Sequence, residues 1–219
     1  MKSHSTLTKY TYMAVRAIMS PFIKSIWVKS HSNVHHIKKH KEAGIIAANH
    51  QSIFDFLCLI SVSGRNIHFL SAEKFFHHKL WKPLMLSTGQ IKVERNAHDK
   101  SEVHATVEKH LFKKNLIGIF PEGTRSHSDT EMLKAFTGVA RYALQHNVPV
   151  IPVGIKGTHH IHNKASKKVN FSKTAEIVVG EPMYFDHLKD GYKDPVVLEE
   201  VTSAIMREIA KLSGKTYPH

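Results

Sequence analysis

The sequence is short of cysteine, of acidic residues and of long apolar runs, and each shortage excludes a class of protein. Cys58 is the single cysteine among 219 residues, so no intrachain disulfide can form, and its place in the apolar stretch 53–60 predicts a small core residue. A reducing, cytoplasmic setting fits this usage. No apolar run reaches the roughly 18 to 20 residues needed to cross a bilayer, so no spanning helix is expected. The first residues also lack the apolar core and the cleavage site of a signal peptide.

Acidic residues number 18 against 31 lysines and arginines, which leaves a formal net charge of +13 with histidine neutral. An excess of this size favours anionic partners: phosphorylated substrates, an anionic membrane surface or nucleic acid. The basic residues are dispersed and do not form a nucleic-acid-binding motif with aromatic residues, so nucleic acid is the weakest of the three. The 19 histidines occur in scattered pairs, such as His159-His160, without the spacing of metal ligands, and no metal site is predicted.

Residues 5–30 carry the pattern of a basic amphipathic helix, with apolar side chains every three or four positions on one face and basic ones on another. The apolar set is Tyr12, Val15, Met19, Phe22 or Ile23, and Ile26, and the basic or polar set is Lys9, Arg16, Ser20 and Lys24. Pro21 interrupts the pattern and predicts two short helices. The pattern fits a helix docked on the domain or one lying in the lipid interface, and Trp27 and the lysines favour the interface.

Beyond residue 34, short apolar segments alternate with segments of helical periodicity. Strands are expected at residues 45–48, 67–70, 90–93, 116–120, 148–153 and 175–179, and helices at 52–62, 80–87, 100–114, 138–146 and 194–212. Strands that alternate with helices predict an α/β fold in which helices flank a layered, largely parallel sheet. We therefore expect residues 1–30 to form an amphipathic helical segment and residues 31–219 to form the α/β domain.

His50 and Asp55 are the first candidates for chemistry. An apolar strand ends at Asn49-His50, and a helical pattern begins near Ser52. In a strand-to-helix turn, Asp55 can accept a hydrogen bond from one imidazole nitrogen, which leaves the other nitrogen able to take a proton from a hydroxyl. On one straight helix the two side chains would lie roughly 140° apart, so the pairing requires the turn. For the pair alone, the alternative is a solvent-facing histidine followed by an acidic residue at a helix start.

A second set of polar residues follows other expected strands. The sequence PEGTR at 121–125 comes directly after an apolar strand. Its glycine permits a tight turn whose N–H groups converge on an anion, and its threonine and arginine carry donors suited to phosphate. Because the carboxyl ends of parallel strands share one edge of a sheet, His50, Arg95 and Arg125 are expected to meet there. The alternative for each arginine is an ordinary exposed side chain at a strand end.

Four segments together resemble the motifs of the glycerophospholipid acyltransferases. Residues 49–55, NHQSIFD, are similar to the family's histidine-aspartate motif, and residues 90–96 resemble the second block, in which an arginine follows a short apolar strand. Residues 120–126, FPEGTRS, match the third block, and residues 148–153, VPVIPV, match the fourth. The blocks stand in the family's order. They are most similar to the bacterial type of 1-acylglycerol-3-phosphate (lysophosphatidic acid) acyltransferase, which usually carries an N-terminal amphipathic two-helix segment.

The resemblance implies an O-acyltransferase that moves a fatty acyl group from acyl-CoA or acyl carrier protein to the free sn-2 hydroxyl of 1-acylglycerol-3-phosphate, giving phosphatidic acid. His50 would act as general base and Asp55 would fix its tautomer, with no cofactor, metal or covalent intermediate. Backbone N–H groups near residues 49–52 are candidate donors to the developing oxyanion. The residues implied for the acceptor phosphate are Arg95, Glu122, which would shape the turn, Gly123, Thr124 and Arg125, and those for the acyl chain are Val150, Ile151 and Pro152.

The resemblance also implies peripheral or monotopic membrane association on the cytoplasmic face. The residues expected to face an anionic membrane surface are Lys9, Tyr12, Arg16, Met19, Phe22, Ile23, Ile26 and Trp27.

One position departs from the family pattern. Members often carry a lysine two residues before the glycine that starts the helix preceding the fourth block, and this sequence has Phe136 there, with Lys134 nearby. The departure leaves open an acyltransferase for a different lysolipid or amphipathic alcohol. A non-enzymatic basic membrane-binding protein is the other alternative, because the net charge and the amphipathic start suit it without catalysis.

Overall fold

The computed structural model describes residues 2–94, 99–162 and 168–219. Its strands are β1 (Val28–Ser32), β2 (Gly44–Ala48), β3 (Ile67–Ala72), β4 (Ile91–Val93), β5 (Leu116–Ile119), β6 (Val150–Lys156) and β7 (Ala175–Val179). Its helices are α1 (Lys2–Trp27), α2 (His35–Lys39), α3 (Phe54–Ser63), α4 (Lys74–His77), α5 (Trp81–Ser87), α6 (Ser101–Phe112), α7 (Gly138–His146), α8 (Thr158–Ile161), α9 (Pro195–Ser213) and the 3₁₀ helix η1 (Asp186–Gly191). The expected strands and helices from residue 45 onward are present, whereas β1, α2, α4, α8 and η1 were not expected.

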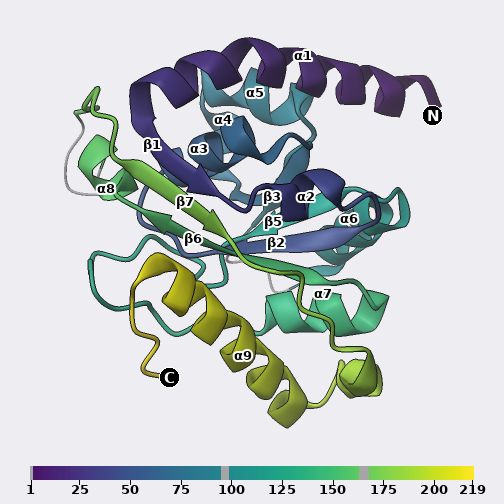
Figure 1. Cartoon of the computed structure of the whole chain (residues 1–219). Coiled ribbons are helices and arrows are strands. Elements are labelled where there is room, and N and C mark those ends of the chain that lie inside the picture. Colours follow the sequence, from purple (N-terminus) through teal and green to yellow (C-terminus); the bar gives the residue numbers. More distant parts are fainter. Residues whose placement is uncertain (1, 95–98, 163–167) are drawn as a thin grey trace.

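The described strands form one sheet in the order β1-β7-β6-β2-β5-β3-β4 (Figure 1). Neighbouring strands are parallel, except that β7 runs antiparallel to β6. The central strand β2 has the sequence GIIAA and is buried along its whole length. Small and apolar residues on both faces are what a parallel strand covered on both sides requires. The predicted α/β fold with a largely parallel sheet flanked by helices is confirmed.

Helices cover both faces of this sheet. In Figure 1, α1 and α3 lie above the sheet, and α7 and α9 lie below it. Ile46 of β2 packs in the upper core with residues of α1 and α3, while its neighbour Ile45 packs in the lower core with residues of α6, α7 and α9. Successive residues of a strand point to opposite faces, so one apolar strand supplies both cores.

The N-terminal segment is one helix, which corrects the prediction of two. Helix α1 continues through Pro21. A proline inside a helix removes one backbone hydrogen bond, and here burial on both sides of it offsets that loss. Tyr12 before the proline and Ile23 after it are 1% and 4% exposed, and the Tyr12 hydroxyl donates a hydrogen bond of 2.7 Å to the carbonyl oxygen of Ile67. Both halves of α1 are therefore held against the domain.

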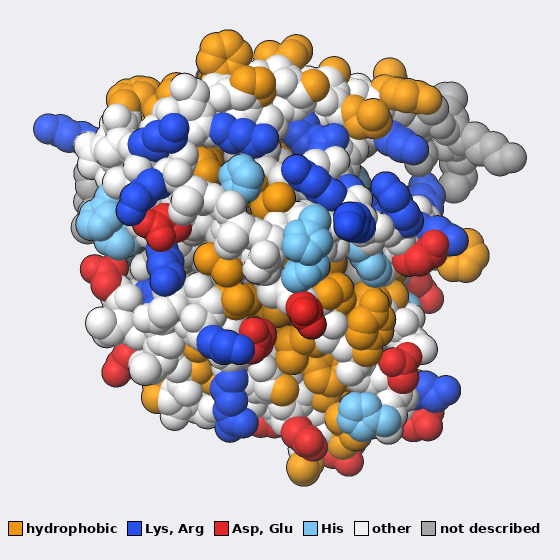
Figure 2. Space-filling model, in the orientation of Figure 1, with side chains coloured by type: hydrophobic (Ala, Val, Ile, Leu, Met, Phe, Trp, Pro, Cys, Tyr) orange, Lys and Arg blue, Asp and Glu red, His pale blue; other side chains and the backbone are white. Residues whose placement is uncertain are grey.

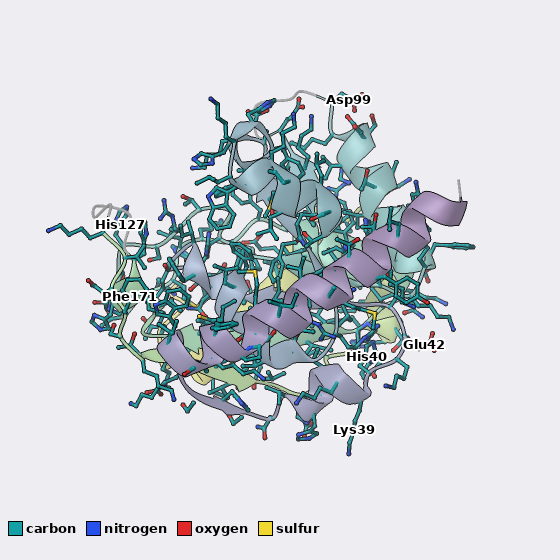
Figure 3. All side chains as sticks on the ribbon, turned by 90° about the horizontal axis from the view of Figure 1, so that it is seen from above. Lys39, His40, Glu42, Asp99, His127 and Phe171 are labelled. Atoms are coloured by element: carbon teal, nitrogen blue, oxygen red, sulfur yellow. The ribbon has the colours of Figure 1, made fainter. Side chains whose placement is uncertain are left out.

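The carboxyl ends of the parallel strands gather at one end of the molecule. Figure 3, seen from above, shows His127, from the loop after β5, at the same end as Phe171. His40 and Glu42, which precede β2, lie toward the other end. The turns that follow β2, β5 and β6 therefore meet at the end marked by His127, where the polar residues of the predicted site are carried.

Candidate active site

His50 and Asp55 are paired in the turn between β2 and α3. The His50 Nδ1 atom lies 2.8 Å from Asp55 Oδ2, and the same oxygen accepts the backbone N–H groups of Gln51 at 2.7 Å and Ser52 at 2.8 Å. Asp55 Oδ1 accepts a short hydrogen bond from the Thr158 hydroxyl at the start of α8. The Asp55 side chain is fully buried, whereas 18% of the His50 side chain is exposed. The buried carboxylate thus fixes the ring and leaves Nε2 as the nitrogen directed away from it.

Two further contacts fix the approach to this turn. The Asn49 side chain forms a pair of 2.8 Å hydrogen bonds with the backbone of Ile155 in β6, donating to its carbonyl and accepting from its N–H. The His50 ring stacks on Phe120, with ring centroids 4.2 Å apart and an angle of 14° between the rings. The backbone and the plane of the imidazole are therefore both held by neighbouring strands.

Residues 121–137 follow β5, and we call them the β5 loop. Within this loop, Glu122 connects the segment to the His50 turn. Its Oε1 accepts the backbone N–H of His50 at 2.8 Å, and its Oε2 accepts that of Leu133 at 2.9 Å. Burial raises the pKa of Glu122, and the hydrogen bonds from Leu133 and His50 oppose that rise. Because the backbone uses both oxygens, the geometry fits the expected shaping of the turn and not direct contact with a phosphate.

The rest of the PEGTR sequence forms a tight turn beside His50. Gly123 has a φ of +65°, and a Cβ atom there would lie 2.6 Å from the ring of Phe136. Only glycine adopts this conformation without strain. The backbone N–H of Ser126 donates to the carbonyl of His50 at 2.8 Å, so the turn is tied to the histidine on both sides. Arg125 is half-buried, and its Nη1 atom is buried with no hydrogen-bond acceptor among the described residues.

Other predicted site residues lie elsewhere or outside the described structure. Arg95 belongs to residues 95–98, which lie outside the described ranges. Val150, Ile151 and Pro152 are buried in strand β6, where Val150 and Ile151 fill the two cores on opposite faces of the sheet. They form part of the packed core and do not line an open pocket in the described structure. The expected acyl-chain wall is not seen at these residues.

The Phe136 and Lys134 positions differ in their surroundings. Phe136 is 71% exposed and covers Gly123. Lys134 Nζ lies 3.6 Å from Glu199 Oε1 of α9, and both side chains are largely exposed. The ring of Phe136 therefore lies against Gly123, and Lys134 forms an ion pair with Glu199 of α9.

The residues predicted for the membrane interface divide between two faces of α1. Tyr12 and Ile23 are buried against the domain, which corrects their assignment to the interface. Ile26 and Trp27 are half-buried, and the Trp27 indole N–H donates to the carbonyl of Asn170 at 3.0 Å. Arg16 is also half-buried, whereas Lys9, Met19 and Phe22 are exposed. The apolar side chains that α1 leaves exposed are Leu7, Tyr10, Met13, Ile18, Met19 and Phe22.

Sequence reasoning missed Thr158, which contacts Asp55, and Lys215, which contacts the β5 loop. Thr158 lies 103 positions beyond Asp55, and Lys215 donates to the carbonyl of Ser128 from beyond the end of α9. Neither residue lies in a motif, and only the fold brings these contacts together. Among the described residues, no group of three or more histidine, cysteine or acidic side chains is arranged to hold a metal ion.

Comparison with known proteins identifies the family to which the chain belongs. The profile of the Acyltransferase family matches residues 26–156, which include β2, the His50 turn, the β5 loop and β6. The solved structure of the 1-acyl-sn-glycerophosphate (LPA) acyltransferase PlsC from Thermotoga maritima superposes with a TM-score of 0.73 at 20% identity, over 99% of this chain and 85% of that one. At that identity the likeness supports the fold.

Relatives of similar sequence include a 1-acyl-sn-glycerol-3-phosphate acyltransferase of Bacillus subtilis, 24% identical over 78% of this chain and 81% of the relative. The Escherichia coli protein of the same name is 29% identical over 59% of this chain and 50% of its own length. An uncharacterized acyltransferase of Schizosaccharomyces pombe is 28% identical over 61% of this chain and 49% of its length. The match thus spans about half the length of the last two. With the profile covering more than half of its residues, the chain belongs to the Acyltransferase family.

Proposed function

We propose that the protein transfers a fatty acyl group from an acyl thioester to the free sn-2 hydroxyl of 1-acylglycerol-3-phosphate, giving phosphatidic acid. The observation that carries the proposal is the His50–Asp55 pair: a fully buried carboxylate holds Nδ1 of a partly exposed imidazole at 2.8 Å. The names of the relatives supply the acceptor, since the Bacillus subtilis and Escherichia coli proteins are named for 1-acyl-sn-glycerol-3-phosphate. The donor is acyl-CoA or acyl carrier protein, and no cofactor is required.

In the proposed reaction, His50 Nε2 takes the proton of the acceptor hydroxyl as its oxygen attacks the thioester carbonyl. Asp55 stabilises the imidazolium that forms. When the tetrahedral intermediate collapses, the carbon–sulfur bond breaks and the same proton passes to the leaving thiolate. The products are an ester and a free thiol, and no enzyme-bound acyl group is needed. Cys58 is an unsuitable nucleophile, because burial raises the pKa of its thiol to about 12.

We propose different oxyanion donors from those expected near residues 49–52. The N–H groups of His50, Gln51 and Ser52 already donate to the Glu122 and Asp55 carboxylates. The N–H groups of Thr124 and Arg125 donate to no group in the described part of the chain, and they follow the left-handed Gly123 in the turn that adjoins His50. We assign them as donors to the oxyanion, because successive N–H groups after such a residue form an anion-binding concavity.

The acyl chain needs an apolar site, and we propose that it enters between α1, α3 and α5, where an apolar cavity of about 30 Å³ would have to widen to receive it. This cavity is lined by side chains that include Tyr12, Met19, Phe56, Leu57 and Met85. A row of aromatic rings joins it to the histidine: Phe56 contacts Phe69, Phe69 stacks on Phe120, and Phe120 stacks on His50. We place the acyl chain of the donor beside the two half-buried rings of this row, Phe56 and Phe120.

Membrane association is proposed from the exposed face of α1. No helix in the described ranges is long and apolar enough to cross a bilayer. Figure 2 shows hydrophobic side chains along the upper edge of the molecule, over α1, with a row of lysine and arginine side chains directly beneath them. Leu7, Tyr10, Ile18 and Phe22 of α1 are each more than 60% exposed. An apolar stripe bordered by cations is suited to lying in the interface of an anionic bilayer, on the cytoplasmic face, with the helix parallel to the surface.

The test is an acyl-transfer assay with purified protein, labelled oleoyl-CoA and a panel of lysolipids, with the product identified by mass. We expect phosphatidic acid from lysophosphatidic acid, and a loss of at least about 100-fold in rate for His50→Ala. His187→Ala, which changes an exposed histidine of η1, is the matched control. Wild-type turnover by His50→Ala would overturn the mechanism. Acylation of another lysolipid alone would reassign the acceptor, and liposome binding without any transfer would favour the non-enzymatic alternative.

A further inference from the structure

Residues 215–217, which follow α9, are attached to the β5 loop. Thr216 exchanges backbone hydrogen bonds with the loop, donating to Thr130 at 2.8 Å and accepting from Met132 at 3.0 Å. The Tyr217 hydroxyl accepts the N–H of Ala135 at 3.3 Å. Figure 1 shows the end of α9 at the left-hand end of the sheet, where the carboxyl ends of the parallel strands lie. Residues 215–217, just after the end of α9, therefore lie against the loop that contains Arg125.

Lys215 is a half-buried cation in this attachment. Its Nζ atom donates to the carbonyl of Ser128 at 2.5 Å, and no carboxylate oxygen of the described residues lies within 4.0 Å of it. Burial lowers the pKa of Lys215, and attraction to Asp129, Glu122 and Asp55 opposes this. The ammonium group therefore lies within the electrostatic reach of the two carboxylates that hold His50, but it has no direct counter-ion in the described structure.

Arg125 also lacks a counter-ion among the described residues. It forms no ion pair with a described carboxylate, and its buried Nη1 lacks an acceptor. Ser126 follows Arg125 directly and donates to the carbonyl of His50, and Ser128, two residues later, accepts from Lys215. Two cations from residues 90 positions apart thus adjoin one short stretch of the β5 loop. Partly burying a cation without a counter-ion costs free energy, and a bound anion would offset that cost.

We propose that Lys215 is a second cation of the substrate phosphate site, which binds a phosphate group together with Arg125. The inference rests on the proposed function and adds a residue that lies outside the four motif blocks. Ser128 uses one of the three N–H donors of the ammonium group, and the other two are directed to the phosphate oxygens. The phosphate belongs either to the monoester of the lysolipid acceptor or to the CoA part of the donor.

Binding is measured first, without turnover. Isothermal titration of the full chain with a soluble short-chain lysophosphatidic acid should give a Kd about tenfold or more higher for Lys215→Gln than for the wild type, and Lys215→Arg should recover most of the affinity. Lys211→Gln is the matched control, because Lys211 lies one turn earlier on α9, is 77% exposed and pairs with Glu208. Thermal melting followed by circular dichroism verifies that each variant is folded.

Kinetics then identify the source of the phosphate. Acceptors with and without a phosphate monoester are combined with two donors, acyl-CoA and an acyl N-acetylcysteamine thioester that carries no phosphate. If Lys215→Gln raises the KM for the phosphorylated acceptor with both donors, Lys215 binds the phosphate of the acceptor. If it raises the KM for acyl-CoA, but not that for the thioester without phosphate, Lys215 binds a phosphate of the donor. Both results support a phosphate-binding lysine.

Three results would overturn the proposal: Kd and KM values within twofold of wild type, an equal loss in Lys211→Gln, or a fall in kcat with unchanged Kd and KM. The last result would leave Lys215 as a brace of the loop only. Phosphate binding that depends on Lys215 in a protein that transfers no acyl group would instead sink the proposed function and leave the phosphate site standing.

Discussion

The hydroxyl of Thr158 donates a hydrogen bond to Oδ1 of Asp55, the carboxylate oxygen opposite the one that contacts His50. Both oxygens of this fully buried carboxylate are therefore engaged, and the His50 ring is oriented by a group that cannot rotate without losing several hydrogen bonds at once.

Thr158→Val should lower kcat by roughly 10- to 100-fold, because a loosened Asp55 lets the imidazole leave its productive orientation. The substitution also leaves a buried carboxylate oxygen without a donor, which should cost about 1–3 kcal/mol of stability. Acyl-transfer rates and urea unfolding measure the two effects. Thr106→Val on α6, whose hydroxyl donates to a carbonyl of its own helix, should change neither by much. Full activity in Thr158→Val would show that Asp55 needs no support from α8.

Gly123→Ala should impair activity more than stability. The positive φ costs an alanine about 1–2 kcal/mol, and its Cβ must displace the exposed ring of Phe136. The PEGTR turn would then shift beside His50, which we expect to raise the KM for the phosphorylated acceptor. Gly138→Ala is the paired control, since a Cβ there meets nothing within 4 Å at the start of α7 and should be neutral or slightly stabilising. Equal kinetics in the two variants would contradict the role of the turn.

The buried His68 and the half-buried His110 that contacts it should make the fold sensitive to acid. The ring centroids lie 4.2 Å apart, and burial is the main cause that lowers the pKa of both, that of His110 to about 3. The unfolded chain binds these protons near pH 6.5 and the folded chain does not, so stability falls as pH decreases below about 6.5. The slope is at most about 1.4 kcal/mol per pH unit for each group.

His110→Gln should flatten the decline between pH 6.5 and about 4, as measured by urea unfolding at several pH values. His187→Gln, which changes an exposed histidine of η1, is the variant for comparison. An unaltered decline in His110→Gln would mean that other groups cause the acid sensitivity.

Phe22→Glu should weaken binding to vesicles of phosphatidylcholine and phosphatidylglycerol by about tenfold or more, because it removes one of the most exposed apolar side chains of α1 and adds a like charge to an anionic surface. Co-sedimentation measures the partition. Val196→Glu is matched in exposure but lies on α9, on the opposite face of the sheet, and should bind normally. Equal losses in both variants would argue against α1 as the contact face.

Met85→Trp should shift donor preference toward shorter acyl chains, because the larger ring fills the cavity between α1, α3 and α5. Competition among acyl-CoA donors of different length, with products separated by mass, measures the shift. Met85→Leu keeps the size of the side chain and should keep the wild-type preference. An unchanged preference in a folded Met85→Trp protein would place the chain elsewhere.

The sequence predicted the family, the fold and the His50–Asp55 geometry because each depends on local order in the chain. An apolar strand, a turn and a helix start determine where residues 50 and 55 lie, and the PEGTR turn follows its strand in the same way. The contacts of Glu122, Thr158 and Lys215 could not be predicted, because they join segments that only the strand order brings together.

The prediction for the exposed face of α1 is wrong at Tyr12 and Ile23 for a related reason. The helix has apolar side chains on two sides, and periodicity does not show which side meets the sheet layer and which stays exposed. The pattern predicts Tyr12 at the lipid, but its hydroxyl donates a hydrogen bond to the backbone of β3, and the neighbouring Met13 is exposed. Pro21 predicts a break in the helix, but the burial of residues on either side of it, which the sequence does not show, keeps α1 continuous.

Helix α1 ends at Trp27 and strand β1 begins at Val28, so no flexible joint separates the proposed membrane helix from the sheet. A chain whose first helix rests on a bilayer would hold its catalytic end at a constant tilt and height above the lipid. Encounters with the lysolipid would then be lateral, within a plane. Turnover should follow the mole fraction of acceptor in the membrane, and diluting the surface with inert lipid should slow the reaction at constant bulk concentration.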